Sequence, residues 1–180
     1  GVGRTFQNLK LFGSMSVLEN LMIGAHQMTK IGLVRFLVDL PGEKREEKLL
    51  TERAEQVLEE IGLADLRHEK VKNLAYGKQK MTELGRALML KPALLILDEP
   101  AAGLNPSERR EFVDILLKTH ERGIDLFLIE HNMDVVMNIS TKITVLNFGA
   151  KIAEGTPYEI QNNDEVIRAY LGDKYKPVEG

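Results

Sequence analysis

The sequence of 180 residues contains no cysteine, so it has neither a disulfide framework nor a zinc site built from thiolates. A surplus of positive charge is also lacking: the formal net charge of -3 argues against binding of nucleic acid through a basic surface. Long apolar segments are missing too, since the longest, such as residues 93–97 and 126–129, are far too short to cross a bilayer. With 43% hydrophobic and 28% charged residues, we expect a globular protein of the cytosol.

The first half of the chain has the periodicity of helices. Residues 44–61 repeat apolar side chains at helical spacing, and Gly62 is placed to end that helix. Residues 18–27 also predict a helix, and a third is expected from Gly77 to the break at Lys91-Pro92.

The second half changes character. Residues 93–97 and 126–130 are apolar runs, typical of strands buried on both faces of a parallel sheet. Between them, Asn105 precedes a proline and stands three residues before Glu108, which predicts a capped helix start. Strand, helix and strand of like direction form a βαβ unit, so the class is α/β. The remainder predicts a helix over 133–139, strands over 142–149 and 151–155 with a turn at Gly149, and short helices over 157–162 and 164–171.

Two adjacent carboxylates, Asp98 and Glu99, follow the first apolar strand in "LLILDEP". One acid there is often only a solvated strand end, but a pair repels itself unless a cation offsets the charge. Asp98 would hold Mg²⁺, and Glu99 would orient or deprotonate an attacking water. His131 ends the next strand and is expected near Glu99, because functional residues of such sheets lie beyond the carboxyl ends of the strands. The other three histidines, at 26, 68 and 120, are read as ordinary surface or core residues.

The segment "LAYGKQK", Leu74–Lys80, predicts a turn before a helix whose free amides and dipole suit a phosphate group. Taken alone this pattern is weak, because helix starts with one glycine are common. The 180 residues contain no G-x-x-x-x-G-K-[ST] loop, and the single Lys followed by Ser or Thr, at Lys118-Thr119, lies inside a predicted helix. The carboxylate pair therefore has no phosphate loop within this sequence.

Five motifs in order resemble the ATP-binding subunit of an ABC transporter. "FQ" at Phe6-Gln7 is similar to the Q-loop, "LAYGKQ" to the signature motif, "LLILDEP" to Walker B, "AAGLNP" to the D-loop and "IEHNM" to the H-switch. The segments "RTFQNLKLFGSMSVLENLMIG", "DEPAAGLNP" and "VIRAYLG" resemble the importers of branched-chain amino acids. The resemblance covers essentially the whole chain.

The resemblance implies a partial P-loop NTPase fold of the ABC ATPase type, with a parallel sheet, helices and an α-helical signature subdomain. It divides the chain into a Q-loop segment (1–14), a helical subdomain with the signature motif (15–91), a RecA-like core with Walker B, D-loop and H-switch (92–150), and a C-terminal strand and helical tail (151–180). In the family the phosphate loop precedes the Q-loop. We therefore expect the sequence to be the C-terminal portion of a longer subunit and inactive as an ATPase on its own.

The resemblance also implies roles for individual residues. Asp98 would ligate Mg²⁺, Glu99 would be the catalytic base, His131 the switch histidine, and Gln7 a sensor of Mg²⁺ and nucleotide. The residues expected to contact ATP on the opposite subunit are Ala75, Tyr76, Gly77, Lys78, Gln79, Gly103 and Asn105. Ala75 replaces the common signature Ser, which removes one hydroxyl contact to phosphate, and Tyr76 replaces the first signature Gly. Asn105 stands where many relatives have Asp and has a second predicted role as helix cap.

For function, the resemblance implies an ATP-hydrolysing importer subunit with ATP and Mg²⁺ as cofactors. Its expected partners are a second ATP-binding subunit and transmembrane permease subunits, with an extracellular solute-binding protein acting indirectly and no nucleic acid. Such a subunit would lie on the cytoplasmic face of the plasma membrane. Two alternatives remain open: a soluble ABC-type ATPase of DNA repair or translation, and a non-catalytic interaction fragment. The apolar segment after Gln7 and the acidic charge weigh against the first, and Glu99 with His131 weighs against the second.

Overall fold

A computed structural model of the chain describes residues 1–5, 9–25 and 43–171, with side chains for residues 48–170 in the last range. The chain divides into two compact units, Gly1–Glu130 and His131–Gly180, and each unit is described by itself. The sequence predicted four segments, a finer division of the chain than these two units, and that division stays a prediction.

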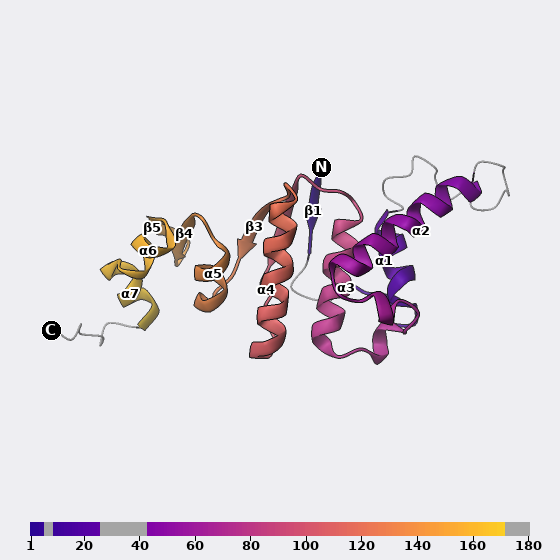
Figure 1. Ribbon diagram of the computed structural model, residues 1–180. Coiled ribbons are helices and arrows are strands. Elements are labelled where there is room, and N and C mark those ends of the chain that lie inside the picture. The colour runs from indigo at the N-terminus through magenta and orange to yellow at the C-terminus, as the bar shows by residue number, and fades with distance from the viewer. Residues whose placement is uncertain (6–8, 26–42, 172–180) are drawn as a thin grey trace. The chain divides into compact units, whose positions relative to one another are not determined.

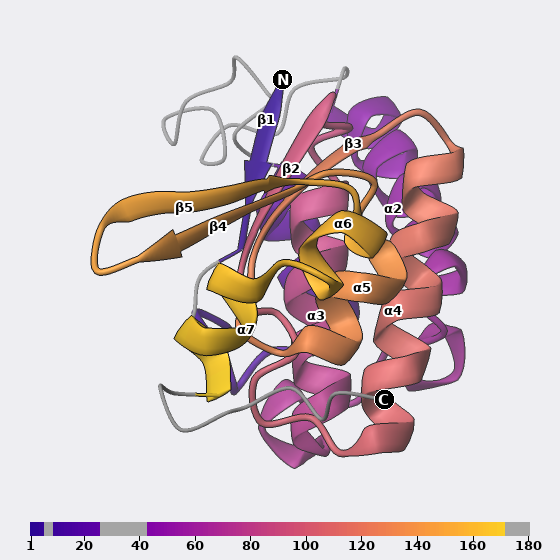
Figure 2. The same ribbon diagram turned by 90° about the vertical axis from the view of Figure 1, so that its left-hand side faces the viewer.

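The first unit is built on three parallel strands, β1 (Val2–Arg4), β2 (Leu94–Asp98) and β3 (Asp125–Ile129), with β2 in the centre (Figure 2). In register, Arg4 lies beside Ile96, and Asp98 beside Ile129. Parallel pairing brings the carboxyl ends of the three strands to the same edge of the sheet. This arrangement confirms the predicted α/β class, although β1 itself was not predicted.

Only one face of this sheet is fully covered within the described residues. On β2, Leu95 and Leu97 are buried, whereas Leu94 and Ile96 are only partly covered. On β3 the exposed and half-buried residues alternate along the strand. The prediction that both strands are buried on both faces is therefore wrong for the described residues, because alternate residues of β2 and β3 stay partly or fully exposed.

Three helices form the larger core of the first unit: α1 (Val17–Ala25), α2 (Glu43–Glu60) and α3 (Tyr76–Leu88) (Figure 1). Two 3₁₀ turns, η2 (Ala64–Leu66) and η3 (Val71–Asn73), connect α2 to α3. The fully buried side chains where the helices meet are Val17, Leu21, Ala54, Val57, Leu58, Ile61, Leu84 and Leu88. The apolar stripe predicted for residues 44–61 is thus confirmed from Ala54 to Ile61, whereas Leu49 at its start is 57% exposed.

Helix α4 (Pro106–Glu121) connects β2 to β3 and begins where the sequence predicted. The Asn105 side chain accepts hydrogen bonds from the N–H groups of Ser107 and Glu108, at 2.9 and 3.0 Å. The Glu108 carboxylate accepts the Asn105 N–H at 3.0 Å, which completes a reciprocal capping box.

The second unit contains α5 (Met133–Ile139), the antiparallel pair β4 (Ile143–Asn147) and β5 (Ala150–Gly155), and the short helices α6 (Pro157–Gln161) and α7 (Asp164–Leu171). Its small core is formed by Ile143, Ile160 and Val166. All five elements agree with the sequence prediction to within about two residues, the usual uncertainty of element ends. Among the helices that the structure describes, none combines the length and the apolar character that a membrane span requires.

Candidate functional site

The paired acids stand where β2 ends. Asp98 is the last residue of the strand, and its carboxylate lies 3.5 Å from the guanidinium of Arg4, at the end of the neighbouring β1. The side chain of Asp98 remains 28% exposed, so it can be reached from solvent. Parallel pairing of β1 with β2 explains the contact, because it brings two strand ends together that are far apart in sequence.

Glu99 turns the chain sharply after the strand. Its φ angle is 44°, in the left-handed region that residues other than glycine seldom occupy. Such a conformation costs about 1–3 kcal/mol and persists only where neighbouring contacts hold it in place. The Glu99 N–H donates to the carbonyl of Ile129 at 2.8 Å, and the Glu99 carbonyl accepts the N–H of Ala102 at 3.1 Å. These bonds fix the direction in which the predicted catalytic base leaves the sheet.

The turn that follows is tied to the end of β3. The Oε1 atom of Glu130 accepts the N–H of Ala101 at 2.9 Å. The N–H of Leu104 then donates to the carbonyl of Ala101 at 3.2 Å. The segment predicted as the D-loop therefore starts from a hydrogen-bonded turn and ends in the cap of α4.

The signature segment, residues 74–79, forms the start of α3 as predicted. Ala75 is its N-cap and makes no side-chain cap bond, so the first amides of the helix lack the capping partner that Asn105 supplies in α4. Two predicted ligand residues make contacts within the chain. Gln79 donates from Nε2 to the carbonyl of Leu74 at 2.9 Å, and Lys78 forms an ion pair with Glu111 of α4 at 2.7 Å.

The structure brings the signature segment and the D-loop together. Gly103 has a φ of 77°, and a Cβ atom added there would lie 2.8 Å from the ring of Tyr76. A Cβ on Gly77 would meet the carboxylate of Glu108 at 2.6 Å. Both glycines therefore permit a close approach between the start of α3 and the segment that leads into α4. Four of the residues predicted to bind nucleotide, Tyr76, Gly77, Gly103 and Asn105, lie on this shared surface.

Lys80 is a residue of this region that sequence reasoning missed. It is only 3% exposed, and its Nζ atom lies 3.5 Å from the carbonyl oxygen of Glu99 and 5.8 Å from the centre of the Tyr76 ring. Burial lowers the pKa of Lys80, while the carboxylates of Glu83, Glu130 and Glu99 oppose that shift. The sequence held a sign of this burial, because Lys80 lies four and eight residues before Leu84 and Leu88 and therefore on the same face of the helix.

The donor set at the end of β2 fits a magnesium ion. Mg²⁺ is commonly held by one or two carboxylates, with waters and substrate phosphates as its other ligands. Asp98 offers an accessible carboxylate at the strand end, beside Glu99. Among the described residues, no group of three or more His, Asp or Glu side chains forms a metal cage.

The two remaining predicted site residues lie outside the described part of the first unit. His131 is exposed and opens the second unit, directly before Asn132, whose side chain caps α5 by accepting the N–H of Val135 at 3.3 Å. Its predicted proximity to Glu99 stays a prediction. Gln7 lies outside the described residues.

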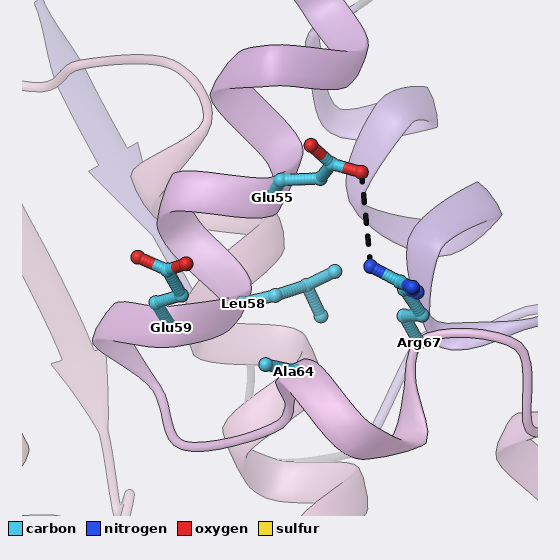
Figure 3. A pocket seen from close by; sticks show the side chains of 5 residues that line it. All are labelled: Glu55, Leu58, Glu59, Ala64 and Arg67. Carbon is cyan, nitrogen blue, oxygen red and sulfur yellow. Dashed lines mark ion pairs between the residues drawn. The ribbon is translucent and has the colours of Figure 1, made fainter.

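A small surface pocket lies elsewhere on the first unit (Figure 3). It is lined by Glu55, Leu58, Glu59, Ala64 and Arg67, with an ion pair of 3.8 Å between Glu55 and Arg67. Its volume of about 80 Å³ is well below the roughly 300 Å³ or more of typical small-molecule sites. The pocket contains none of the predicted site residues, and we assign it no role in nucleotide binding.

A parallel sheet with an acid pair at its carboxyl edge, beside an uncapped helix start and a Gly-containing turn, defines a protein of the phosphate-handling α/β class. Comparison with known families narrows this class. The ABC transporter family profile matches residues 1–102, and that of the branched-chain amino acid ATP-binding cassette transporters matches residues 150–176. The chain belongs to the ABC transporter family of ATP-binding proteins.

Among its relatives, the chain is 46% identical over 175 residues to the high-affinity branched-chain amino acid transport ATP-binding protein LivG of Salmonella typhimurium. It is 42% identical over 174 residues to BraF of Pseudomonas aeruginosa, another high-affinity branched-chain amino acid transport ATP-binding protein. Each alignment covers 96% of this chain and 68% of the relative, so the chain spans about two thirds of their length.

Solved structures agree with the fold. An ATP-binding cassette of an ABC transporter in its ADP conformation matches with a TM-score of 0.78 and 32% identity, over 96% of this chain and 69% of that one. A nucleotide-free ATP-binding cassette matches with a TM-score of 0.78 and 34% identity, over the same shares. The predicted ABC ATPase fold is therefore confirmed.

Proposed function

We propose that this chain is part of the ATP-hydrolysing subunit of an ABC importer for branched-chain amino acids. The observation that carries this proposal is the acid pair at the end of β2, held against the start of α3 and the D-loop, in a chain so similar to transport ATP-binding proteins. The choice of solute rests on those relatives and on the profile that matches residues 150–176.

Within the proposed reaction, each residue has a chemical task. Glu99 accepts a proton from the attacking water or orients it, and Asp98 provides the carboxylate for Mg²⁺. When bound, Mg²⁺ would offset the charge of the phosphate oxygens. His131 would hold the water or the terminal phosphate, and Gln7 would link the nucleotide site to the membrane subunit.

We further propose that the start of α3 serves a nucleotide on a second copy or a related subunit. The uncapped amides at the start of α3 favour an anion, and Gly77 and Gly103 let this helix start and the D-loop segment lie close together. Ala75, Tyr76, Lys78, Gln79 and Asn105 belong to the same surface. Such a dimer would be attached to permease subunits at the cytoplasmic face of the membrane, with the solute-binding protein acting through those subunits.

The decisive experiment is Glu99→Gln in a subunit of the full length of its relatives, assembled with its permease partners. The substitution keeps the shape of the side chain and removes the base, so we expect ATP hydrolysis to fall by about 10²–10⁴-fold while ATP binding persists. Glu121→Gln, at the exposed end of α4, is the matched control and should hydrolyse ATP at the native rate. Hydrolysis by Glu99→Gln at the native rate would contradict the proposal.

A further inference from the structure

Lys80 lies in a place that is unusual for a lysine. It is on the buried side of α3 and only 3% exposed, with Met81, Leu84 and the equally buried Glu83 beside it on the helix. Lysine is seldom fully buried unless its charge is paired, because removing an ammonium group from water is costly. The helix therefore retains a charged side chain where an apolar one would pack without this penalty.

The ammonium group is directed at one particular peptide. Its Nζ atom lies 3.5 Å from the carbonyl oxygen of Glu99, long for a hydrogen bond. The positive charge strengthens this contact, because a charge acts on a carbonyl dipole more strongly in a buried site than in water. The charges of the carboxylates of Glu83, Glu130 and Glu99 act to raise the pKa of the group and so favour its charged form.

The peptide that Lys80 contacts is the strained one. Glu99 has a φ of 44°, and its N–H group is already bound to Ile129. On its carbonyl side, the oxygen accepts the N–H of Ala102 and lies within reach of the Lys80 ammonium group. A conformation of this kind persists where surrounding contacts over-determine it. Loss of one of these contacts would let the Glu99 peptide relax and redirect its side chain.

We propose that Lys80 is a positioning residue that holds the Glu99 peptide in its left-handed conformation and connects it to the start of the signature helix. Tyr76, whose ring lies 5.8 Å from Nζ, also packs against Gly103, so the turn after β2 is held from the start of α3 at two points. The inference rests on the proposed function, since it requires that Glu99 act on the attacking water. Lys80 itself touches no reacting atom and acts through the direction of Glu99.

The test uses three variants of the full-length subunit assembled with its permease. Lys80→Met removes the charge and keeps most of the apolar chain, and Lys80→Arg keeps the charge. Lys80→Met combined with Glu83→Gln also removes one of the carboxylates that Lys80 neutralises. Lys118→Met, at an exposed position of α4, is the matched control. The readouts are kcat and KM for ATP, with the thermal midpoint measured in parallel.

We expect Lys80→Met to lower kcat by about 10–100-fold with KM changed by less than about twofold, because a misdirected base slows the chemical step and leaves nucleotide binding intact. Lys80→Arg should recover at least about half of the native kcat, and Lys118→Met all of it. If Lys80→Met does not fold, the double variant Lys80→Met with Glu83→Gln distinguishes a positioning role of Lys80 from a role in charge neutralisation. A role limited to charge neutralisation predicts that the double variant regains both stability and kcat, whereas positioning predicts that kcat stays low.

Native kcat in a folded Lys80→Met variant, or full recovery of kcat in the double variant, would overturn the inference. Failure of the proposed function is distinguishable from these results. If the proposed function is wrong, the Glu99→Gln subunit should hydrolyse ATP at the native rate, regardless of the rates of the Lys80 variants. An inactive Glu99→Gln subunit beside a fully active Lys80→Met subunit would reject the positioning role alone.

Discussion

The carboxylate of Glu130 accepts the backbone N–H of Ala101 at 2.9 Å, across 29 positions of sequence. Glu130 follows β3, and Ala101 stands in the turn after β2, so the bond joins the ends of two neighbouring strands. A charged acceptor makes a stronger bond than a neutral one, and Ala101 is buried, which makes an unsatisfied N–H there expensive.

Glu130→Ala should therefore lower the free energy of unfolding by about 1.5–3 kcal/mol, the range for hydrogen bonds to charged groups. Glu130→Gln keeps an acceptor oxygen and should be less destabilising. Urea denaturation of both variants measures the difference. Equal stability of Glu130→Ala and the native chain would show that the bond to Ala101 contributes nothing.

Gly85 provides a test in which packing opposes intrinsic propensity. Replacing a helical glycine by alanine normally stabilises a helix by about 1 kcal/mol. Here a Cβ atom would lie 2.6 Å from Cδ1 of Ile61, with Leu21 and Val57 at 3.3 and 3.4 Å. Because these side chains are fully buried, we expect Gly85→Ala to destabilise the chain by about 1–3 kcal/mol, the usual result of overpacking.

Ile61→Val removes the atom that clashes and supplies the control for Gly85→Ala. Alone it should cost about 0.5–1.5 kcal/mol. In the Ile61→Val background, Gly85→Ala should be clearly less destabilising, so the double-mutant cycle should give a favourable coupling energy. Additive free energies of unfolding would show that Ile61 is not the obstacle.

The sequence predicted best what depends on local chemistry. The start of α4 followed from Asn105, Pro106 and Glu108, because a capping box involves only neighbours in the chain. The acid pair was located for a similar reason, since a short apolar run followed by two carboxylates is visible without knowledge of the fold. The turn at Gly149, with a φ of 82°, is a further local feature.

Contacts between distant segments were not predictable in this way. Strand β1 has three residues, and its extended conformation depends on pairing with β2. The Arg4–Asp98 ion pair depends on that same register. For Lys80 a weak sign existed, a lysine in an apolar stripe, but its contact with the Glu99 carbonyl requires the packing of α3 against the end of β2. An apolar run does not say which of its faces is covered, so the sequence did not identify the face of the sheet that is open.

Acid should weaken one specific ion-pair cluster in the second unit. Glu154 accepts hydrogen bonds from the ammonium groups of Lys142 and Lys151, and these bonds and charges lower its pKa from 4.5 to about 2. Because the folded-state pKa is below the ordinary value, the contribution of Glu154 to stability is present above about pH 4.5 and is lost as the pH falls towards 2.

A carboxyl NMR titration of Glu154 measures this shift directly. Lys142→Met should raise the midpoint more than Lys151→Met, because the hydrogen bond from Lys142 is the larger cause. Lys118→Met should leave the midpoint unchanged. A native midpoint near 4.5 would show that neither lysine holds the carboxylate in solution.

The predicted role of His131 can be tested by a matched pair of histidine variants. His131→Ala, in the full-length subunit with its permease, should reduce the ATP hydrolysis rate by about 10²-fold, because a preorganised contact to the reacting phosphate or water is lost. His68→Ala removes another exposed histidine that is not part of the predicted site, and it should retain native activity. Equal rates for the two variants would reject the assignment of His131.

The open face of the three-stranded sheet carries the last prediction. Val2 is 63% exposed, Phe127 56% and Ile129 48%, and the parallel register places these side chains on one face. Each large apolar side chain left in water forgoes about 1.5–3 kcal/mol of burial, against a typical domain stability of about 5–15 kcal/mol. A contiguous apolar surface on a sheet also favours association with other copies.

We therefore expect the 180-residue polypeptide, produced alone, to bind a hydrophobic dye and to self-associate, as measured by dye fluorescence and light scattering. Phe127→Ser combined with Ile129→Ser should reduce both signals, because it removes apolar area from the open face. Leu146→Ser combined with Phe148→Ser is the control, since it removes two apolar side chains at the β4–β5 hairpin that are even more exposed. If the control reduces the signals as much as the first pair, the sheet face is not the cause. A monomeric native polypeptide with a sharp thermal transition and no dye binding would show that this face is covered in solution.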